Sequence, residues 1–463
     1  MKSERRQWGS RLLARAGACC LLWLSTCSPE RSVSRHPAAP PAVTVTPQAR
    51  SSPPPSSPPS ELVCSWARGW TRETRGGRGG RFVRVTTLSS DGPGSLRAAL
   101  AEPGPRIIVF EVGGVIDLGL SKLRVTEPFV TIAGQTAPSP GITLVRGGLV
   151  VATHDVVIQH LRVRPGAAGQ SKGWEPDGIT TTAGSYDVVV DHCSLTWAVD
   201  ENLSASGPRF NGEAPAEWRR GTSHRVTFSH NIVAEGLARS THSKGEHSKG
   251  SLIHDNVGEV LVFANLYASN AERSPLFKGG ARGVVANNWI VNPGKIAMGY
   301  ALVRKEWAEH APELGQLTVV GNVLWHGRDT PPATPLLLGL GSGPCEVFLS
   351  DNEALDLQRQ PVALLGGVLA NLQQVERPPL WPPGFQAMPA RDVVQRLRAE
   401  VGARPWDRDE VDERIVRQAL AGESAIIDSE EDVGGYPRPA EARAPFRAEA
   451  WDECMASVTS PLR

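Results

Sequence analysis

The sequence lacks the features that mark several common classes of protein. Beyond residue 27, no apolar run approaches the roughly 20 residues that a membrane-spanning helix needs. Lys and Arg number 49 against 48 Asp and Glu, so no charge excess points to nucleic acid or to an acidic solvating tail. The seven cysteines contain no CxxC pair. These absences exclude a nucleic-acid-binding protein and disfavour a membrane-embedded or zinc-binding one.

Glycine and proline are abundant, whereas aromatic residues are few. The chain has 463 residues, with 47 Gly, 38 Pro and 6% aromatic residues. This composition is more typical of a turn-rich β protein than of a helical bundle. The length is ample for one large hydrophobic core with appendages.

The first 27 residues have the pattern of an export signal. Basic residues from Lys2 to Arg15 precede a short apolar core at residues 16–24. The segment LSTC, which ends at Cys27, resembles the processing site of a bacterial lipoprotein, and ordinary cleavage with release is the alternative. Residues 28–60 are rich in Pro and Ser and predict an extended tether. We expect an exported protein, either a lipoprotein of the cell surface or outer membrane or a secreted protein, whose domain occupies residues 61–463.

Four cysteines follow the export signal. A bridge between Cys64 and Cys454, or another pairing, is compatible with an oxidising compartment, but the sequence cannot assign it. Cys193, in the middle of a predicted strand, is expected to be a small buried packing residue.

Short apolar segments recur at steady intervals along most of the chain. Strands are predicted at residues 82–88, 107–110, 129–132, 142–145, 156–163, 188–197, 225–233, 260–268, 284–291 and 317–325. No long helical pattern intervenes, which disfavours a doubly wound sheet. Segments such as VVVDHCSL, VTFSHNIV and VVANNWIV share an apolar approach, a polar or small turn and an apolar return.

Alignment of these segments places six residues at equivalent positions, roughly 20–40 residues apart, which is the period of a solenoid. The six are Leu161, Cys193, Asn231, Asn265, Asn288 and Asn322. Asparagines in register predict an internal ladder in which each side-chain amide bonds to the next coil. We therefore predict an all-β fold, a right-handed parallel β-helix. The repeat fades after residue 330, and helices are predicted at residues 390–401 and 410–419, in an extension from about 380 to 463 that packs across the end or flank of the solenoid.

One stretch, VVVDHCSLTWAVDENLS at residues 188–204, combines a strand pattern with acids at both ends. Charged groups beside a packed strand are costly unless they are paired, hydrogen-bonded or bound to a cation. Two further acids, Glu175 and Asp177, precede it in WEPDGI and would share one face if that piece is extended. These acids predict a functional site, and their pairing with arginines or capping of turns is the structural alternative.

Several motifs occur together in a specific order. They are GGRGGRFVRVTTLSSDGPGSLRAAL, FVTIAGQTAPSPGITLVRG, VVVDHCSLTWAVDE, RSPLFKGG and GARPWDRDEVDERIV, within residues 66–437. This set resembles polysaccharide lyase family 1, the pectate lyases, and in particular a bacterial branch of that family. The resemblance implies calcium-assisted β-elimination of polygalacturonate or pectin, which leaves 4,5-unsaturated oligogalacturonates. The expected partner is this acidic polysaccharide, and we expect a monomer.

The resemblance implies a set of calcium ligands. Glu175 and Asp177 match the family's first acidic pair, with Glu175 where Asp is more usual, and Asp200 matches a ligand one coil along. Asp191 is expected to contribute to the same cluster. The family's further acid falls on Ser204, so calcium is expected to bind weakly or to need substrate oxygens to complete its shell.

The resemblance also implies roles for basic residues. In RSPLFKGG, Arg273 has the position of the proton abstractor, although arginine is a poor base and a carboxylate clamp is its alternative role. Lys278 stands where the family commonly has Arg and keeps the charge without the bidentate fork. Lys249 matches a substrate-binding lysine, and Lys244 in the near-copy HSKGEHSKG is the alternative.

Other chemistries are less well supported by the sequence. His242, His247 and His254 lie near these lysines, but their spacing matches no tight zinc motif. A polygalacturonase-type hydrolase on the same fold would have Asp191 and Asp200 as its available carboxylates. A non-catalytic carbohydrate-binding β-helix is the third function, and the departures at Ser204 and Lys278 are its support.

Overall fold

The computed structural model describes residues 69–449 and Trp451. The predicted export signal and tether lie outside the described residues, as do Cys27, Cys64 and Cys454. Within the described part, the chain winds through three sheets, and strands of successive coils pair in parallel. Only β30, near the C-terminus, pairs antiparallel, with β3. The predicted parallel β-helix is confirmed.

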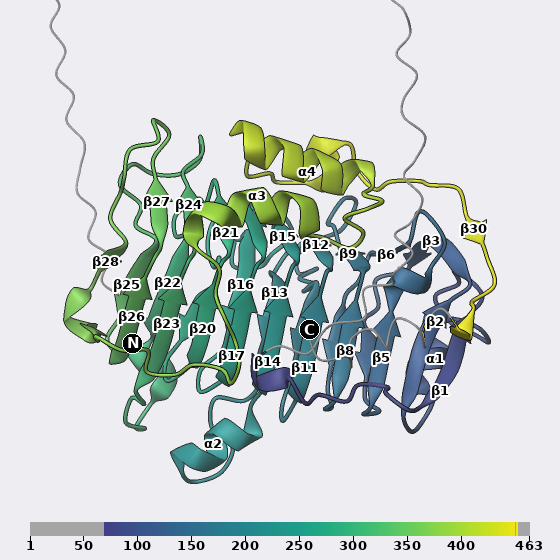
Figure 1. Ribbon diagram of the computed structural model, residues 1–463, viewed down its shortest axis with the longest axis horizontal. Helices are drawn as coiled ribbons and strands as arrows, with labels where there is room; N and C mark the ends of the chain where they lie inside the picture. Colours follow the sequence, from purple (N-terminus) through teal and green to yellow (C-terminus); the bar gives the residue numbers. More distant parts are fainter. Residues whose placement is uncertain (1–68, 450, 452–463) are drawn as a thin grey trace, which may run out of the picture. The chain divides into compact units, whose positions relative to one another are not determined.

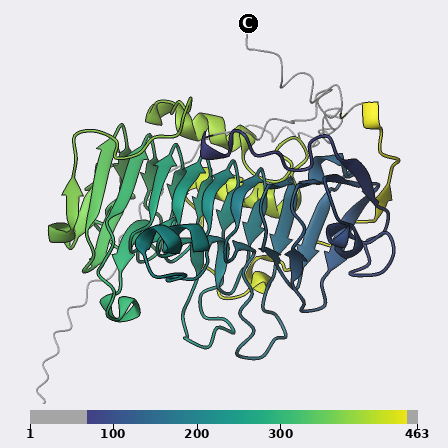
Figure 2. The ribbon, with the colours of Figure 1, turned by 90° about the horizontal axis from the view of Figure 1, so that it is seen from below.

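The strands of each sheet stack side by side along the axis of the solenoid (Figures 1 and 2). The 11-stranded sheet consists of β1 (Arg81–Val85), β2 (Arg106–Phe110), β5 (Val130–Ala133), β8 (Val156–Gln159), β11 (Tyr186–Asp191), β14 (His224–Ser229), β17 (Gly258–Phe263), β20 (Arg282–Ala286), β23 (Gly315–Val320), β26 (Cys345–Ser350) and β29 (Leu372–Gln374). The 10-stranded sheet consists of β30 (Ala442–Arg443), β3 (Val112–Asp117), β6 (Ile142–Val145), β9 (Leu161–Arg164), β12 (Ser194–Thr196), β15 (Ile232–Ala234), β18 (Leu266–Ala268), β21 (Trp289–Val291), β24 (Val323–Trp325) and β27 (Glu353–Leu355). The 9-stranded sheet consists of β4 (Leu123–Val125), β7 (Leu149–Val151), β10 (Ile179–Thr181), β13 (Glu201–Ala205), β16 (Lys249–Ile253), β19 (Leu276–Lys278), β22 (Met298–Leu302), β25 (Leu337–Gly341) and β28 (Leu365–Gly367).

Inward-pointing side chains of successive coils stack into aliphatic rows. In the 11-stranded sheet, one row places Val190 between Ile158 and Phe228, and Val262 follows on the next coil. All four side chains are fully buried in one core cluster that runs along the solenoid. Because parallel strands stack in register, the apolar residues that alternate along each strand align into this continuous core.

The predicted asparagine ladder is present at the corner between the 11- and 10-stranded sheets. The Nδ2 of Asn231 donates to Oδ1 of Asn265 at 2.9 Å, and the same bond links Asn265 to Asn288. Asn288 donates to Asn322 at 3.0 Å, and Asn352, which the alignment did not include, extends the ladder by one rung. Each amide also donates to a backbone carbonyl, so these buried polar groups are satisfied.

The predicted long strands are each divided into two. The segment predicted as one strand at residues 188–197 forms β11 and β12, separated by His192 with a φ of 49°. His160 and His230 have φ values of 57° and 53° at the equivalent corners of neighbouring coils. A residue in this left-handed conformation turns the chain from one sheet into the next. The third strand of each coil was not predicted, because several of these strands have only three residues.

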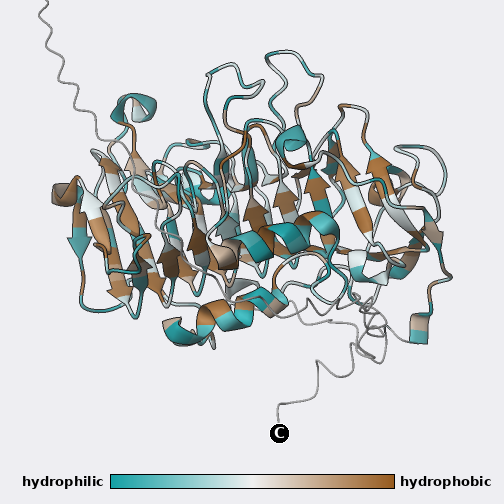
Figure 3. Ribbon diagram, turned by 90° about the horizontal axis from the view of Figure 1, so that it is seen from above, coloured by the Kyte–Doolittle hydropathy of each residue, from teal (hydrophilic) through white to brown (hydrophobic). Residues whose placement is uncertain are grey.

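Of the four α-helices in the described residues, the last two cover one flank of the solenoid (Figure 1). The helices are α1 (Leu96–Ala101), α2 (Pro215–Gly221), α3 (Ala390–Glu400) and α4 (Glu410–Ala421). The apolar faces of α3 and α4 pack on outward-facing residues of the 10-stranded sheet, in a cluster that joins Val393 and Ile415 to Ile232 and Trp289. Figure 3 shows hydrophilic residues on these helices above largely hydrophobic strands. Both helices begin where the sequence predicts, and within the described residues no helix is long and apolar enough to cross a membrane.

Candidate active site

Charged residues lie where four neighbouring strands of the 9-stranded sheet begin. Glu201, the first residue of β13, pairs with Lys249, the first residue of β16. Lys249 forms a bridge in turn with Glu272, which immediately precedes Arg273 and the start of β19. Asp177, two residues before β10, accepts a hydrogen bond from the backbone N–H of Glu201 at 3.3 Å. One edge of this sheet therefore carries acids and bases on successive coils.

Three carboxylates at this edge form an acidic group, which consists of Asp177, Asp200 and Glu201. One carboxylate oxygen from each lies within 4.8 Å of the other two. Burial, followed by the charge of Asp200, raises the pKa of Asp177 to about 7. Burial also acts to raise the pKa of Asp200, but the hydrogen bond from His247 and the charges of His247, His242 and Arg273 together outweigh burial and lower this pKa. Carboxylates held this close repel one another, so the group favours a bound cation or a shared proton.

Arg273 faces the acidic group. Its guanidinium Nη1 forms an ion pair with Oε1 of Glu201, a residue that is only 5% exposed. Arg273 has a φ of 67°, and the peptide bond between Ser274 and Pro275 is cis. Burial lowers the pKa of Arg273, and the charge of Asp200 partly opposes this. A cation of lowered basicity thus lies directly beside three carboxylates.

The predicted substrate-binding lysines do not gather in one place. Lys249 lies beside Arg273 and forms an ion pair with Glu272, with 2.6 Å between Nζ and Oε2. Lys278 is at the opposite end of β19, where it pairs with Glu306 and, at 3.4 Å, with Asp255. Lys244 is exposed in the loop that precedes β16. Lys249 is bridged to the residue before Arg273, whereas Lys278 pairs with Glu306, whose charge also acts on Arg273. The substrate-binding role of Lys278 stays a prediction.

Glu175 and Asp177 both lie near Asp200, but they have different hydrogen-bond partners. The oxygen Oε1 of Glu175 accepts a hydrogen bond from the backbone N–H of Ser243 at 2.6 Å, on the loop before β16. Asp177 instead belongs to the acidic group. The segment that holds both acids lies outside the assigned strands, with Pro176 between them, and a shared face for the two acids stays a prediction.

Ser204 lies on β13 between Thr180 and Leu252 of the neighbouring strands. It is 1% exposed, and Leu252 belongs to a small apolar cluster with Leu276 and Ala301. The position that carries an acid in the resembled family therefore adjoins an apolar strip. Ser204 therefore contributes no carboxylate to the acidic group, whose third carboxylate is that of Glu201.

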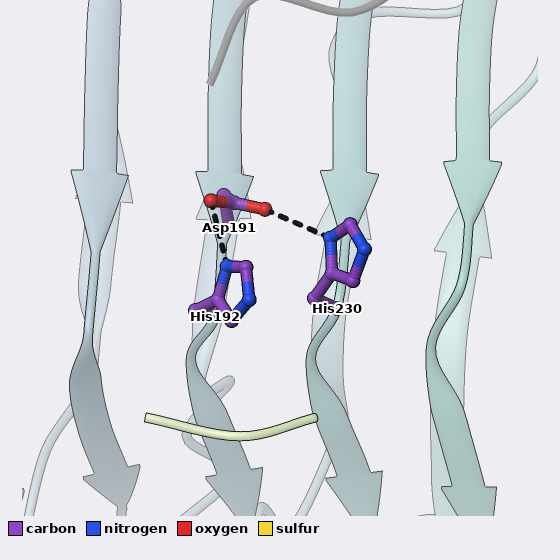
Figure 4. A group of neighbouring side chains, drawn as sticks. All are labelled: Asp191, His192 and His230. Carbon is purple, nitrogen blue, oxygen red and sulfur yellow. Dashed lines mark hydrogen bonds and ion pairs between the residues drawn. The ribbon is translucent and has the colours of Figure 1, made fainter. Parts of the chain in front are cut away.

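Asp191 does not join the acidic group, which corrects its assignment as a metal ligand. It ends β11 and lies with His192 and His230 in a separate buried group (Figure 4). Its Oδ2 accepts from Nδ1 of His192 at 2.9 Å and from Gln159 at 3.0 Å. Its Oδ1 accepts from Ser229 at 2.7 Å and from His230 at 3.2 Å. With both oxygens satisfied, Asp191 braces the corner between two sheets.

The same corner predicts a pH-dependent stability. His160 stacks on His192 and donates from Nδ1 to the carbonyl of Ala403, and burial lowers its pKa to about 3. The charges of His192 and Arg404 lower this pKa further, whereas Asp191 raises it. An unfolded histidine has a pKa near 6.5, so the unfolded chain binds the additional proton, and stability is lost as the pH falls below about 6.5.

We expect this histidine to contribute a loss of about 2 kcal/mol in the free energy of unfolding between pH 7 and pH 5. Urea unfolding at several pH values should show a smaller slope for His160→Asn, because asparagine tolerates the left-handed backbone and can donate to the Ala403 carbonyl. The surface variant His310→Asn is the control. An unchanged slope in His160→Asn would contradict the assignment.

Sequence reasoning missed two charged residues of this site, Glu201 and Glu272. Glu201 follows Asp200 directly, and neighbouring residues along a strand point to opposite faces. This alternation allowed only one of the two acids in the predicted site, and the resemblance favoured Asp200. The chain turns between these two residues where β13 begins, so both carboxylates reach the same group. Glu272 adjoins Arg273 in the sequence, and only the pairing of β16 with the next coil brings it to Lys249.

Known proteins resemble this chain in sequence over about half of its length and in fold over about three quarters of it. No family model matches the chain. Over 234 residues it is 37% identical to a probable pectate lyase C of Emericella nidulans, which covers 50% of this chain and 48% of the relative. Over 267 residues it is 34% identical to a probable pectate lyase C of Aspergillus flavus, which covers 57% of this chain and 54% of the relative. The chain thus spans about half the length of these curated relatives, which are fungal and lend no support to the bacterial branch.

Solved structures share the fold at low sequence identity. The cedar pollen allergen Jun a 1 superposes with a TM-score of 0.52 and 17% identity, over 74% of this chain and 93% of the allergen. The thermostable pectate lyase PL 47 superposes with a TM-score of 0.51 and 15% identity, over 75% of this chain and 99% of the enzyme. At these identities the likeness establishes the β-helix fold alone.

Proposed function

We propose that the protein is a pectate lyase that cleaves polygalacturonate or pectin by calcium-assisted β-elimination. The observation that carries this proposal is the acidic group with Arg273 in ion-pair contact and Lys249 on the next coil. Asp177, Asp200, Arg273 and Lys249 are residues for which the resemblance to polysaccharide lyases implies roles, and this supports the proposal. The 37% identity to a relative named as a probable pectate lyase supports the same activity.

The acidic group fits calcium in its chemistry. Asp177, Asp200 and Glu201 offer hard oxygen ligands, which calcium prefers. Burial first, and then the charge of Asp200, raises the pKa of Asp177, and a bound cation would oppose both effects. Glu175 lies at the edge of this group, where it accepts a hydrogen bond from the backbone N–H of Ser243, and Nε2 of His242 lies 3.6 Å from Glu175 and 3.8 Å from Asp200. Bound calcium supplies positive charge that neutralises the uronate carboxylate as negative charge develops on the substrate.

The side chains of the chain perform the remaining steps. Lys249 binds the acidic sugar by its charge. Arg273 accepts the C5 proton, and the electron pair of the C5–H bond forms a double bond between C4 and C5. The bond from C4 to the glycosidic oxygen breaks, and the leaving oxygen takes a proton from water. Arg273 then returns its proton to the hydroxide that remains, which regenerates the base. One product has a new reducing end with a free hydroxyl, and the other has a 4,5-unsaturated uronate at its new non-reducing end.

Arg273 can act as a base only if its environment weakens its hold on the proton. Burial already lowers its pKa, whereas the acidic group raises it. Neutralisation of those carboxylates by cations therefore shifts the balance toward the neutral guanidine, which links the acidic group to the proton transfer.

A hydrolase of the polygalacturonase type is less well supported. The carboxylates available to such a hydrolase are Asp191 and Asp200, but these residues belong to two separate groups. The contact of Arg273 with the acidic group is not explained by a mechanism that uses two carboxyl groups alone.

The wider setting of the enzyme is also part of the proposal. We propose that the protein is exported, either secreted or held at the cell surface through a lipid on Cys27, with residues 28–60 as the tether. Its folded domain would act as a monomer on an extracellular acidic polysaccharide. The predicted signal and tether support this arrangement by their composition alone.

The test is an ultraviolet absorbance assay for the unsaturated product. Purified protein with polygalacturonate and calcium is expected to raise the absorbance, and removal of calcium by a chelator should lower the rate by at least about 100-fold. A panel with differently methylated pectins, from neutral to alkaline pH, covers the substrate class. New reducing ends without absorbance would indicate a hydrolase, and binding without turnover would indicate a carbohydrate-binding protein.

A further inference from the structure

The loop before β16 brings together two histidines that the proposed lyase chemistry does not use. His242 and His247 stack with 3.5 Å between ring centroids and an angle of 15° between planes. His254, the third histidine of this region, lies at the other end of β16 beside Asp255. The spacing of the three histidines in the sequence did not indicate a metal site, because the loop folds only His242 and His247 against each other.

Both imidazoles face carboxylates from other segments of the chain. Nε2 of His247 donates to Oδ1 of Asp200 at 2.9 Å. Nε2 of His242 lies 3.8 Å from the same oxygen and 3.6 Å from Oε2 of Glu175. One ligand atom each from Asp200, His242 and His247 lies within 4.8 Å of the others. Three separate segments thus converge on one point with two nitrogens and carboxylate oxygens.

The second observation is an unpartnered nitrogen in the middle of this group. The side chain of His242 is fully buried, and among the described residues its Nε2 has no hydrogen-bond partner. A buried polar atom without a partner is uncommon in folded proteins and calls for an explanation such as a bound ion. The distances of 3.6 and 3.8 Å to the carboxylates are too long for hydrogen bonds but leave space for a shared cation.

We propose that His242, His247, Asp200 and Glu175 bind a divalent first-row transition metal ion. Two imidazoles with carboxylates suit zinc and its neighbours, whereas calcium prefers a shell of oxygens. The site shares Asp200 with the acidic group, so the ion would fix the loop that carries Lys244 and the position of Asp200. In this sense the inference extends the proposed function, although binding itself does not depend on lyase activity.

Binding requires a change at each imidazole. His247 donates from Nε2 to Asp200, so coordination through this nitrogen moves the ring proton to Nδ1 and replaces the hydrogen bond. The backbone N–H of Lys244 donates to Nδ1 of His242 at 3.1 Å, which leaves the ring proton on Nε2. Coordination through Nε2 moves that proton to Nδ1, so the Lys244 peptide must turn away. Gly245, with a φ of 90°, follows directly and gives the loop the freedom to do so.

The experiment titrates the full-length protein, without a histidine tag and after dialysis against chelator, with zinc alone in a calorimeter. We expect one site, and His242→Ala and His247→Ala should each weaken zinc binding at least about 10-fold. The control variants His254→Ala and His310→Ala should bind as the wild type does. Glu175→Gln, a change at the rim, should weaken zinc binding without affecting folding, which circular dichroism and thermal unfolding monitor.

Cobalt supplies an independent readout, because its visible absorption reports nitrogen and carboxylate ligands. The spectrum should appear with wild type and disappear with His242→Ala, and a large excess of calcium should leave it in place. Absence of a zinc site, an equal loss in His254→Ala, or displacement by an equal concentration of calcium would each overturn the inference. Zinc binding by a protein without lyase activity would refute the proposed function and not this site. Lyase activity in a protein that does not bind zinc would refute this site and not the proposed function.

Discussion

Arg273→Ala is expected to lower the rate of β-elimination by about 100- to 10,000-fold, the usual contribution of a general base. The side chain is in ion-pair contact with Glu201 and adjoins the acidic group, at a corner where acids and bases of successive coils meet. The measurement is the initial rate of absorbance increase on polygalacturonate, with kcat and KM determined separately. A lost base lowers kcat, whereas a lost carboxylate clamp mainly raises KM.

Two controls make this result interpretable. Removal of Arg273 leaves the buried Glu201 without its partner, so the double variant Arg273→Ala with Glu201→Gln separates the missing base from the unpaired charge. Arg239→Ala, an exposed arginine paired with Asp428, is the matched surface change and should retain full activity. Near-normal kcat in Arg273→Ala would refute the catalytic role, and recovery by Arg273→Lys with only KM affected would favour the clamp.

Asp412→Ala is expected to destabilise the protein by about 3–5 kcal/mol, the cost of breaking a buried ion pair by removal of one partner. The carboxylate is fully buried where α4 meets the solenoid, and it accepts from Arg162 at 3.1 Å and from Arg164 at 2.9 Å. Ser194 donates to it as well, at 2.7 Å. Without it, two buried guanidiniums would share the single carboxylate of Asp409.

Urea unfolding measures this loss, and limited proteolysis shows whether α3 and α4 detach before the solenoid unfolds. Asp392→Ala, on the exposed surface of α3, is the matched control and should change the free energy of unfolding by less than about 0.5 kcal/mol. A change below about 1 kcal/mol in Asp412→Ala would mean that water replaces the lost carboxylate, and that the helices are held by their apolar cluster alone.

The sequence by itself determined the coil and its register. A β-helix repeats the same local environment in every turn, so the period of apolar residues and the recurring asparagines predicted both the fold and the ladder from Asn231 to Asn322. The helices at residues 390 and 410 followed from their own local pattern. The resemblance to lyases, rather than the pattern, singled out Arg273 and Lys249, which adjoin in the structure.

Only the tertiary structure decided how the charged residues group. Asp191 and Asp200 are nine positions apart in one motif, yet the chain crosses two corners between them and delivers each to a different group. Glu201 and His242 entered the site through contacts between coils and from a loop, where no periodic pattern constrains the chain. The physical reason is that stacking fixes neighbours within a sheet, whereas corners and loops choose the direction of each side chain through packing that the local sequence does not encode.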